Sequence, residues 1–217
     1  PWAIHNRIPI MLSPRLPAGV PELTVTRVHA HGHVFDITAR PNEVVLVDRN
    51  CHKSVHHGVI LSGARPVYLD SAVNQTYGIF GPVPRATILR TLAAHPDAKV
   101  LILTSCTYDG LRYELAPIVA AAHAAGIKVI VDEAWYGHAR FHPELRPTAL
   151  ECGADYVTQS THKVLSAFSQ ASMIHVNDPA FDEHLFRENF NMHASTSPQY
   201  NLIASLDVAR KQAVMEG

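Results

Sequence analysis

The stretch Thr158-Gln-Ser-Thr-His-Lys-Val-Leu-Ser-Ala-Phe-Ser-Gln-Ala-Ser-Met173 sets one lysine, Lys163, among serine and threonine residues directly after an apolar segment. Partial burial and cationic neighbours would favour the neutral amine, which can attack an aldehyde. The pattern is typical of a lysine that holds pyridoxal phosphate as a Schiff base. A lone lysine on a loop is more often a surface residue, but the hydroxyl-rich surroundings favour the functional interpretation.

Asp132 strengthens this interpretation from upstream. It ends the apolar run Ile127–Val131, where its carboxylate could accept a hydrogen bond from a protonated pyridine nitrogen and keep that nitrogen cationic. The alternative is a helix N-cap, since Glu133 and Ala134 follow. Ala134 and Trp135 would then lie close to the ring, although Trp135 could instead be a core aromatic residue.

The chain from residue 44 onward alternates between short apolar strands and helices with short loops. The sequence predicts strands at 44–47, 66–69, 99–103, 127–131, 155–158 and 171–176, and helices at 52–61, 84–94, 115–124, 181–190 and 206–217. Gly63 and Gly126 suit the C-terminal ends of two helices. This alternation predicts an α/β fold, a three-layer sandwich with a mostly parallel sheet. Ligands bind beyond the carboxyl ends of such strands, where Asp132 and the segment 160–163 both fall.

Other polar groups also follow predicted strands. Ser160 and His162 could hold a phosphate group at the start of the loop, or serve ordinary turn chemistry. His52 follows the strand at 44–47, so its ring could stack on a cofactor or cap the next helix. The segment Thr107–Gly110 could line the same pocket or form a plain Asp-Gly turn.

Composition excludes several classes of protein. The 217 residues are 47% hydrophobic with a net charge of −1, which is enough for one sizeable core and gives no sign of a nucleic-acid or polybasic membrane-binding surface. No apolar run reaches the length of a membrane span. The cysteines Cys51, Cys106 and Cys152 are far apart and odd in number, so we expect a reducing, cytoplasmic setting. Both ends have the character of a piece of a longer chain.

The first 43 residues fit the alternating pattern less well. His29, His31 and His33 alternate, which would put them on one face of a strand. A metal site is possible there, but no acidic or cysteine partner is close in sequence, so we expect solvated histidines and no metal.

Taken together, these segments resemble the Orn/Lys/Arg decarboxylase family, whose pyridoxal-phosphate domain has the aspartate-aminotransferase fold. The run Ser160–Lys163, with the serine-rich residues that follow it, resembles the family's cofactor-attachment signature. Blocks in the matching order are Asp48–Ser54, Thr107–Gly110, Asp132–Trp135 and Thr196–Pro198. The resemblance implies that residues 44–217 form an incomplete major domain of fold type I. Residues 1–43 would be a divergent or truncated segment, without the family's Gly/Ser/Thr-rich phosphate loop.

The resemblance also implies roles for individual residues. Lys163 would form the Schiff base, and Asp132 would pair with the pyridine nitrogen. His52 would stack on the cofactor ring, and Ser160 and His162 would hold the phosphate. Ala134 and Trp135 would lie beside the ring, with Trp135 near its phenolic oxygen. The implied reaction removes CO2 from lysine, arginine or ornithine to give the amine.

The same resemblance implies a homodimer or larger homo-oligomer, with residues 194–197 at its interface, and no nucleic-acid or membrane partner. Two alternatives stay open at this point. One is a catalytically impaired remnant that acts as a binding or oligomerisation module, which the absent phosphate loop favours. The other is an aminotransferase or other lyase of the same fold.

Overall fold

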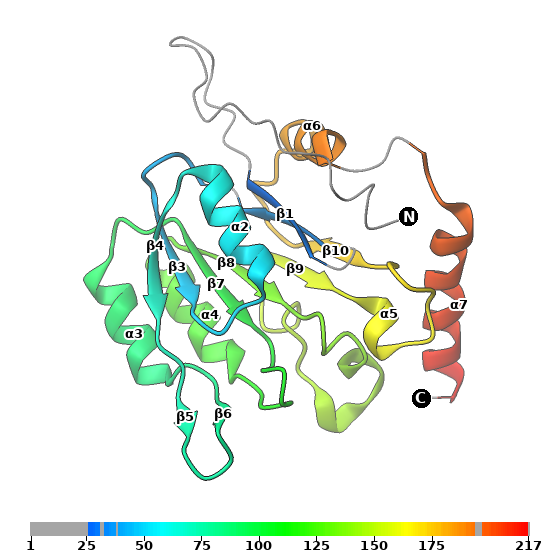
Figure 1. Cartoon of the computed structure of the whole chain (residues 1–217), viewed down its shortest axis with the longest axis horizontal. Helices are drawn as coiled ribbons and strands as arrows, with labels where there is room; N and C mark the ends of the chain where they lie inside the picture. The colour runs from blue at the N-terminus through cyan, green and yellow to red at the C-terminus, as the bar shows by residue number, and fades with distance from the viewer. Residues whose placement is uncertain (1–25, 31–32, 38, 194–196, 217) are drawn as a thin grey trace.

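The computed structural model describes residues 26–30, 33–37, 39–193 and 197–216. Its centre is a six-stranded sheet in the order β10-β9-β8-β7-β3-β4 (Figure 1). The strands in that order are β10 (Met173–Val176), β9 (Tyr156–Gln159), β8 (Lys128–Asp132), β7 (Val100–Thr104), β3 (Val44–Asp48) and β4 (Arg65–Leu69). All neighbours pair in parallel except β10, which runs antiparallel to β9. The predicted α/β fold with a mostly parallel sheet is confirmed.

Helices on both faces of the sheet complete three layers. One face packs against α3 (Arg85–Ala94) and α4 (Leu115–Ala124), which bury apolar side chains against alternate strand residues such as Leu46 and Leu101. The other face packs against α2 (Lys53–Ser62) through the intervening residues, including Val45 and Ile102. Because both faces of the sheet are covered, the strand sequences are continuous runs of apolar residues, and such runs can be recognised in the sequence.

The remaining elements lie around this core. The strands β1 (Thr26–Ala30) and β2 (His33–Ile37) form an antiparallel hairpin beside α2, and β5 (Val73–Asn74) pairs with β6 (Ile79–Phe80) in a second one (Figure 1). Short helices occur at α5 (Thr161–Val164), η1 (Ala139–Phe141) and η2 (Pro143–Leu145). The last two helices are α6 (Glu183–His193) and α7 (Tyr200–Glu216), and α7 stands beyond α5 (Figure 1).

Two expectations about local structure are wrong. The terminal helix begins at Tyr200 rather than at residue 206. His29 and His33 lie on two different strands, β1 and β2, and not along one strand, because these strands pair antiparallel with Ala30 opposite His33. His31 lies outside the described residues. Within the described ranges no three His, Cys, Asp or Glu side chains are grouped as metal ligands would be, and none of the helices described there is long and apolar enough to cross a membrane.

The helix ends follow the expected glycine chemistry. Gly63 ends α2 with φ 65°, and its N–H donates to the carbonyl of Ile60. Gly126, just past α4, has φ 71° and donates to the carbonyl of His123. Only glycine adopts this left-handed conformation without strain, so both positions close their helices as expected.

Substitution of the central strand tests this core. Leu103 in β7 is completely buried against α4 and its neighbours, so Leu103→Ala should cost about 2–5 kcal/mol of unfolding free energy through lost burial and a cavity. Leu89→Ala on α3, where the side chain is 40% exposed, should cost less than about 1 kcal/mol. Urea denaturation of both variants measures this; equal losses would contradict the described core.

Candidate functional site

The candidate site lies at the carboxyl edge of the parallel strands. Asp132 is the last residue of β8 and pairs in register with Thr104, the last residue of β7. Ser160 directly follows β9, and α5 carries Lys163 immediately after it. Parallel strands bring their carboxyl ends to one edge of the sheet, so residues distant in sequence meet there.

Lys163 is half-buried and its amine faces an aromatic ring. Nζ lies 5.1 Å from the centroid of the Trp135 ring, a distance at which an ammonium is attracted to the ring face. Burial lowers the pKa of Lys163, while the negative charge of Asp132 acts in the opposite direction. A lowered pKa increases the fraction of neutral amine, the form that can attack an aldehyde.

Trp135 is not a core residue. Its side chain is 41% exposed, with Lys163 on its face and the ring of Tyr108 edge-on at a centroid distance of 5.5 Å. Tyr108 belongs to the segment Thr107–Gly110, so this segment reaches the neighbourhood of Lys163 through Trp135. The alternative that Trp135 fills the core is therefore wrong, and the ring lines the surface beside the amine.

Asp132 is a buried carboxylate, 7% exposed, that accepts a hydrogen bond from the N–H of Ala134 at 3.0 Å. Burial raises its pKa to about 6, against the lowering effects of that hydrogen bond and of Lys163, and the charge of Asp48 raises it further. A turn rather than a helix follows it at 134–138, so the helix N-cap alternative is wrong. Ala134 is buried next to it.

The start of α5 holds buried hydroxyl groups that lack partners. Ser160 Oγ and Thr161 Oγ1 are buried without a hydrogen bond in the described structure, as is Thr158 Oγ1 on β9. Leaving a buried hydroxyl unsatisfied costs free energy, and such groups are rare. Hydroxyl donors suit a ligand rich in oxygen acceptors, so the residues present fit the phosphate oxygens and the phenolic oxygen of pyridoxal phosphate.

The two histidines have structural contacts. His162 Nδ1 lies 2.8 Å from the carbonyl oxygen of Ala171, and this contact ties together the two ends of the loop 162–171. A phosphate would therefore have to bind the other ring nitrogen of His162, Nε2. His52 Nδ1 accepts from the N–H of Ser54 at 3.2 Å, so His52 caps α2 as the structural alternative supposed. Stacking of His52 on a cofactor stays a prediction.

Two buried carboxylates near the site were missed. Glu133 is completely buried and accepts from the N–H of Ala149 at 2.9 Å and from Gln159 Nε2 at 2.7 Å; burial raises its pKa, against those hydrogen bonds. Asp48 ends the apolar run of β3 just as Asp132 ends that of β8. That shared position at a strand end was the signal that could have identified Asp48.

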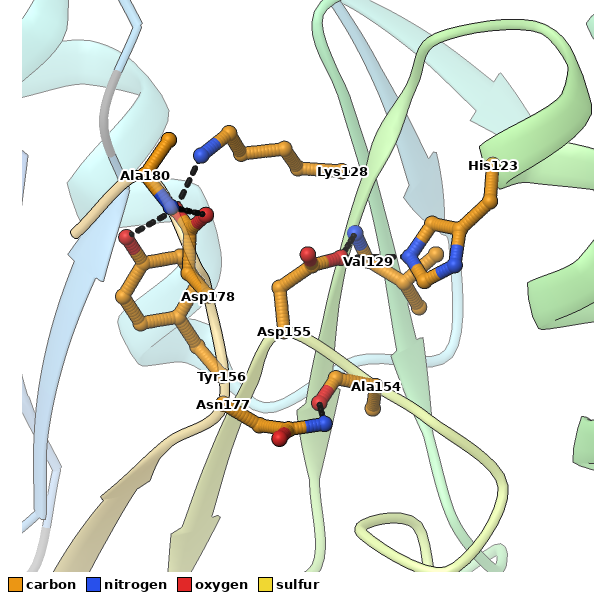
Figure 2. Close-up of polar contacts among 9 residues, drawn as sticks. All are labelled: His123, Lys128, Val129, Ala154, Asp155, Tyr156, Asn177, Asp178 and Ala180. Carbon is orange, nitrogen blue, oxygen red and sulfur yellow. Dashed lines mark hydrogen bonds and ion pairs between the residues drawn. The ribbon is translucent and has the colours of Figure 1, made fainter.

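A second polar cluster lies at the opposite, amino edge of the sheet (Figure 2). Asp155 accepts from the N–H of Val129 at 2.7 Å and contacts His123 Nε2 at 2.8 Å. Asp178 is contacted by Lys128 Nζ and by Tyr156 Oη. Burial alone would raise the pKa of Asp178, but these hydrogen bonds and one from Ala180 outweigh it and lower the pKa. All these groups satisfy one another, so the cluster fastens β8, β9 and the end of β10 together.

Comparison with known proteins agrees with this geometry. Residues 27–217 match the model of the family described as "Orn/Lys/Arg decarboxylase, major domain". The chain belongs to the Orn/Lys/Arg decarboxylase family. The match begins at residue 27, earlier than the similarity expected from residue 44, and the division of the chain at residue 44 stays a prediction.

Relatives of this Orn/Lys/Arg decarboxylase family chain include the lysine decarboxylase LdcA of Pseudomonas aeruginosa, 44% identical over 199 residues that cover 81% of the chain and 26% of the relative. An arginine decarboxylase of Bacillus cereus is 37% identical over 177 residues, covering 82% and 38%. The chain thus spans between a quarter and two fifths of the length of these relatives.

Solved structures give the same family and fold. The lysine decarboxylase LdcF of Francisella novicida superposes with a TM-score of 0.68 at 35% identity, over 83% of this chain and 26% of that one. Lysine decarboxylase A of Pseudomonas aeruginosa gives 0.68 at 40% identity, over 86% and 27%. A serine palmitoyltransferase of Sphingomonas wittichii, 20% identical with a TM-score of 0.63 over 83% and 43%, shares the fold.

The raised pKa of Asp132 predicts a pH-dependent stability. With the folded pKa at about 6 and the reference value at 3.8, folded Asp132 holds its proton more tightly than unfolded Asp132. Stability of the cofactor-free chain should therefore fall as pH rises from about 4 to 6, and stay reduced above it. Asp132→Asn removes this loss and should be more stable than wild type at pH 7 by on the order of 2–3 kcal/mol.

Urea denaturation of both proteins at pH 4 and pH 7 checks this. The difference between wild type and Asp132→Asn should be small at the lower pH and grow at the higher one. A difference that does not change with pH would contradict the burial of an ionisable Asp132.

Proposed function

We propose that this chain carries the pyridoxal-phosphate site of an enzyme that decarboxylates a basic amino acid, lysine, arginine or ornithine, to its amine and CO2. The observation that carries the proposal is the half-buried Lys163 at the carboxyl edge, with its Nζ on the Trp135 ring and within the electrostatic influence of buried Asp132. The relatives named as lysine and arginine decarboxylases support the substrate class.

Each residue has a defined task in this proposal. Pyridoxal phosphate, when bound, supplies an electron sink for the electrons that CO2 leaves behind on the α-carbon. Lys163 Nζ would hold the cofactor through its aldehyde carbon, with loss of water, and the amine would also be placed to carry a proton to the α-carbon of the substrate. The Asp132 carboxylate would keep the pyridine nitrogen protonated, because its buried position would strengthen the attraction between the two charges.

The other site residues bind and orient. The hydroxyl groups of Ser160 and Thr161 would donate to phosphate oxygens and would so gain the partners that they lack among the described residues. Trp135 covers one side of the Lys163 amine and, with Ala134, would border the cofactor ring. His52, held by its contact with Ser54 at the loop after β3, would stack on the cofactor ring. His162 stiffens the loop that follows Lys163.

The proposal extends to the setting of the protein. We propose a homodimer or larger homo-oligomer, with a small amino acid as substrate. The cysteines Cys51, Cys106 and Cys152 are not joined in disulfides, which is consistent with a reducing, cytoplasmic compartment. The named decarboxylase relatives favour this reaction over that of an aminotransferase. Product analysis, amine with CO2 against keto acid, separates the two reactions.

Cofactor attachment is the experiment that tests the proposal. Addition of pyridoxal phosphate should give a visible absorbance band that survives desalting and disappears on borohydride reduction. Lys163→Ala should lack the band, because it lacks the amine that bonds to the aldehyde. Lys211→Ala, which removes an exposed lysine from α7, serves as the matched control and should keep the band.

Absence of the band in a folded wild-type chain would contradict the proposal and favour a remnant without cofactor. Retention of the band in Lys163→Ala would place the attachment elsewhere.

A further inference from the structure

Asp48, at the carboxyl end of β3, is a buried charge that the proposed chemistry does not use. Its side chain is 1% exposed, and its carboxylate accepts hydrogen bonds from four groups that the structure describes. These are Asn50 N–H at 2.9 Å and Ser71 Oγ at 3.4 Å on Oδ1, and Thr104 Oγ1 at 2.9 Å and Tyr113 Oη at 2.8 Å on Oδ2. A buried carboxylate is tolerated when its oxygens are satisfied in this way.

These contacts join segments that are far apart in the sequence. Thr104 ends the neighbouring strand β7, and Tyr113 lies just before α4. The Tyr113 hydroxyl also accepts from the N–H of Val83, at 2.8 Å, just before α3. Asp48 therefore fastens the end of β3 to the end of β7 and to the starts of two helices.

The same carboxylate shapes the turn that leads to His52. The hydrogen bond from Asn50 N–H closes a turn after β3, and the N–H of Cys51 donates to the backbone carbonyl of Asp48 at 3.1 Å. His52 is the next residue and caps α2. The direction in which the chain leaves β3, and so the place of the His52 ring, depends on these bonds.

This turn lies beside Asp132. Thr104, which donates to Asp48, pairs in register with Asp132. The pKa values of two ionisable groups near Asp48 are raised. Burial raises the pKa of Cys51 to about 12, and the charges of Asp48 and Asp132 add to this effect. Burial also raises the pKa of Tyr113, as does the charge of Asp48. The strand register and the hydrogen bond from Thr104 thus place the Asp48 turn at the candidate site.

We infer that Asp48 is a positioning residue of the cofactor site, which holds the turn 49–52 against β7 and thereby fixes His52 at the edge where Asp132 and Lys163 lie. The inference rests on the proposed function, since it assigns His52 to the cofactor. Asp48 itself is buried and bonded to protein donors, so it would act through His52 and not by touching the cofactor. What matters is the hydrogen-bonding shape of its side chain.

Equilibrium dialysis of the cofactor-free chain against pyridoxal phosphate tests the inference. Asp48→Ala leaves the N–H of Asn50 and the three hydroxyl groups without their acceptor and should raise the apparent Kd about tenfold or more. Asp48→Asn keeps one oxygen that can accept from the N–H of Asn50, and its NH2 group can donate to the hydroxyl oxygens of Thr104 and Tyr113. The Kd of this variant should therefore stay within about threefold of wild type. Equal weakening in both variants would overturn the positioning role.

Asp155→Ala is the matched control. Asp155 is also a buried carboxylate that accepts from a backbone N–H, but at the opposite edge of the sheet (Figure 2). Asp155→Ala should lower the melting temperature without changing the Kd for pyridoxal phosphate. If Asp155→Ala weakened binding as much as Asp48→Ala, the effect would be general destabilisation and the inference would fail. The inference would also fail if Asp48→Ala bound pyridoxal phosphate as tightly as wild type.

Hydrogen exchange separates this inference from the proposed function. In the absence of cofactor, Asp48→Ala should speed exchange of the amides of Asn50 and Cys51 while those of β7 stay protected; unchanged exchange would overturn the inference. A wild-type chain that fails to bind pyridoxal phosphate would count against the proposed function alone.

A second variant keeps the inference testable if Asp48→Ala does not fold. Tyr113→Phe removes one donor to Oδ2 of Asp48 and should raise the Kd for pyridoxal phosphate about threefold. An unchanged Kd would overturn the inference.

Discussion

The parallel pairing of β3, β7, β8 and β9 is the constraint on which the rest of the structure depends. It forces the ends of strands that are separated by dozens of residues to meet at one edge. Asp48, Thr104, Asp132 and Ser160 each stand at or just after such an end. Without the register that sets Asp132 beside Thr104, none of these polar groups would share a site.

Burial then decides what the polar groups can do. The same apolar layers that stabilise the sheet bury the carboxylates of Asp48 and Asp132 at its edge, so their charges act on neighbouring groups more strongly than charges at the surface do. Burial raises the pKa of Asp132 and lowers that of Lys163, while the attraction between them opposes both shifts. A carboxylate and an amine held in this balance suit a cofactor with a cationic ring nitrogen and an aldehyde. The carboxylates at the other edge, Asp155 and Asp178, are fully engaged by protein donors and serve the fold.

Much of the fold could be predicted because doubly covered strands are continuous apolar runs and glycines close the helices. Lys163 and Asp132 could be placed for the same reason, since each follows such a run. The contacts of Asp48 could not be predicted: its partners Thr104 and Tyr113 are 56 and 65 residues away, and only the folded register brings them together. The reversal between β1 and β2 was missed because alternating histidines look like one strand. The sequence left the exposure of Trp135 open, because an aromatic residue after a strand is as typical of a core as of a site.

The most direct test of the central claim is mass spectrometry of the chain after loading with pyridoxal phosphate, borohydride reduction and proteolysis. The account predicts a pyridoxyl group, in near-stoichiometric amount, on the peptide that contains Lys163. Label spread over exposed lysines such as Lys211, or absent from the Lys163 peptide, would contradict the assignment of this edge of the sheet as the cofactor site.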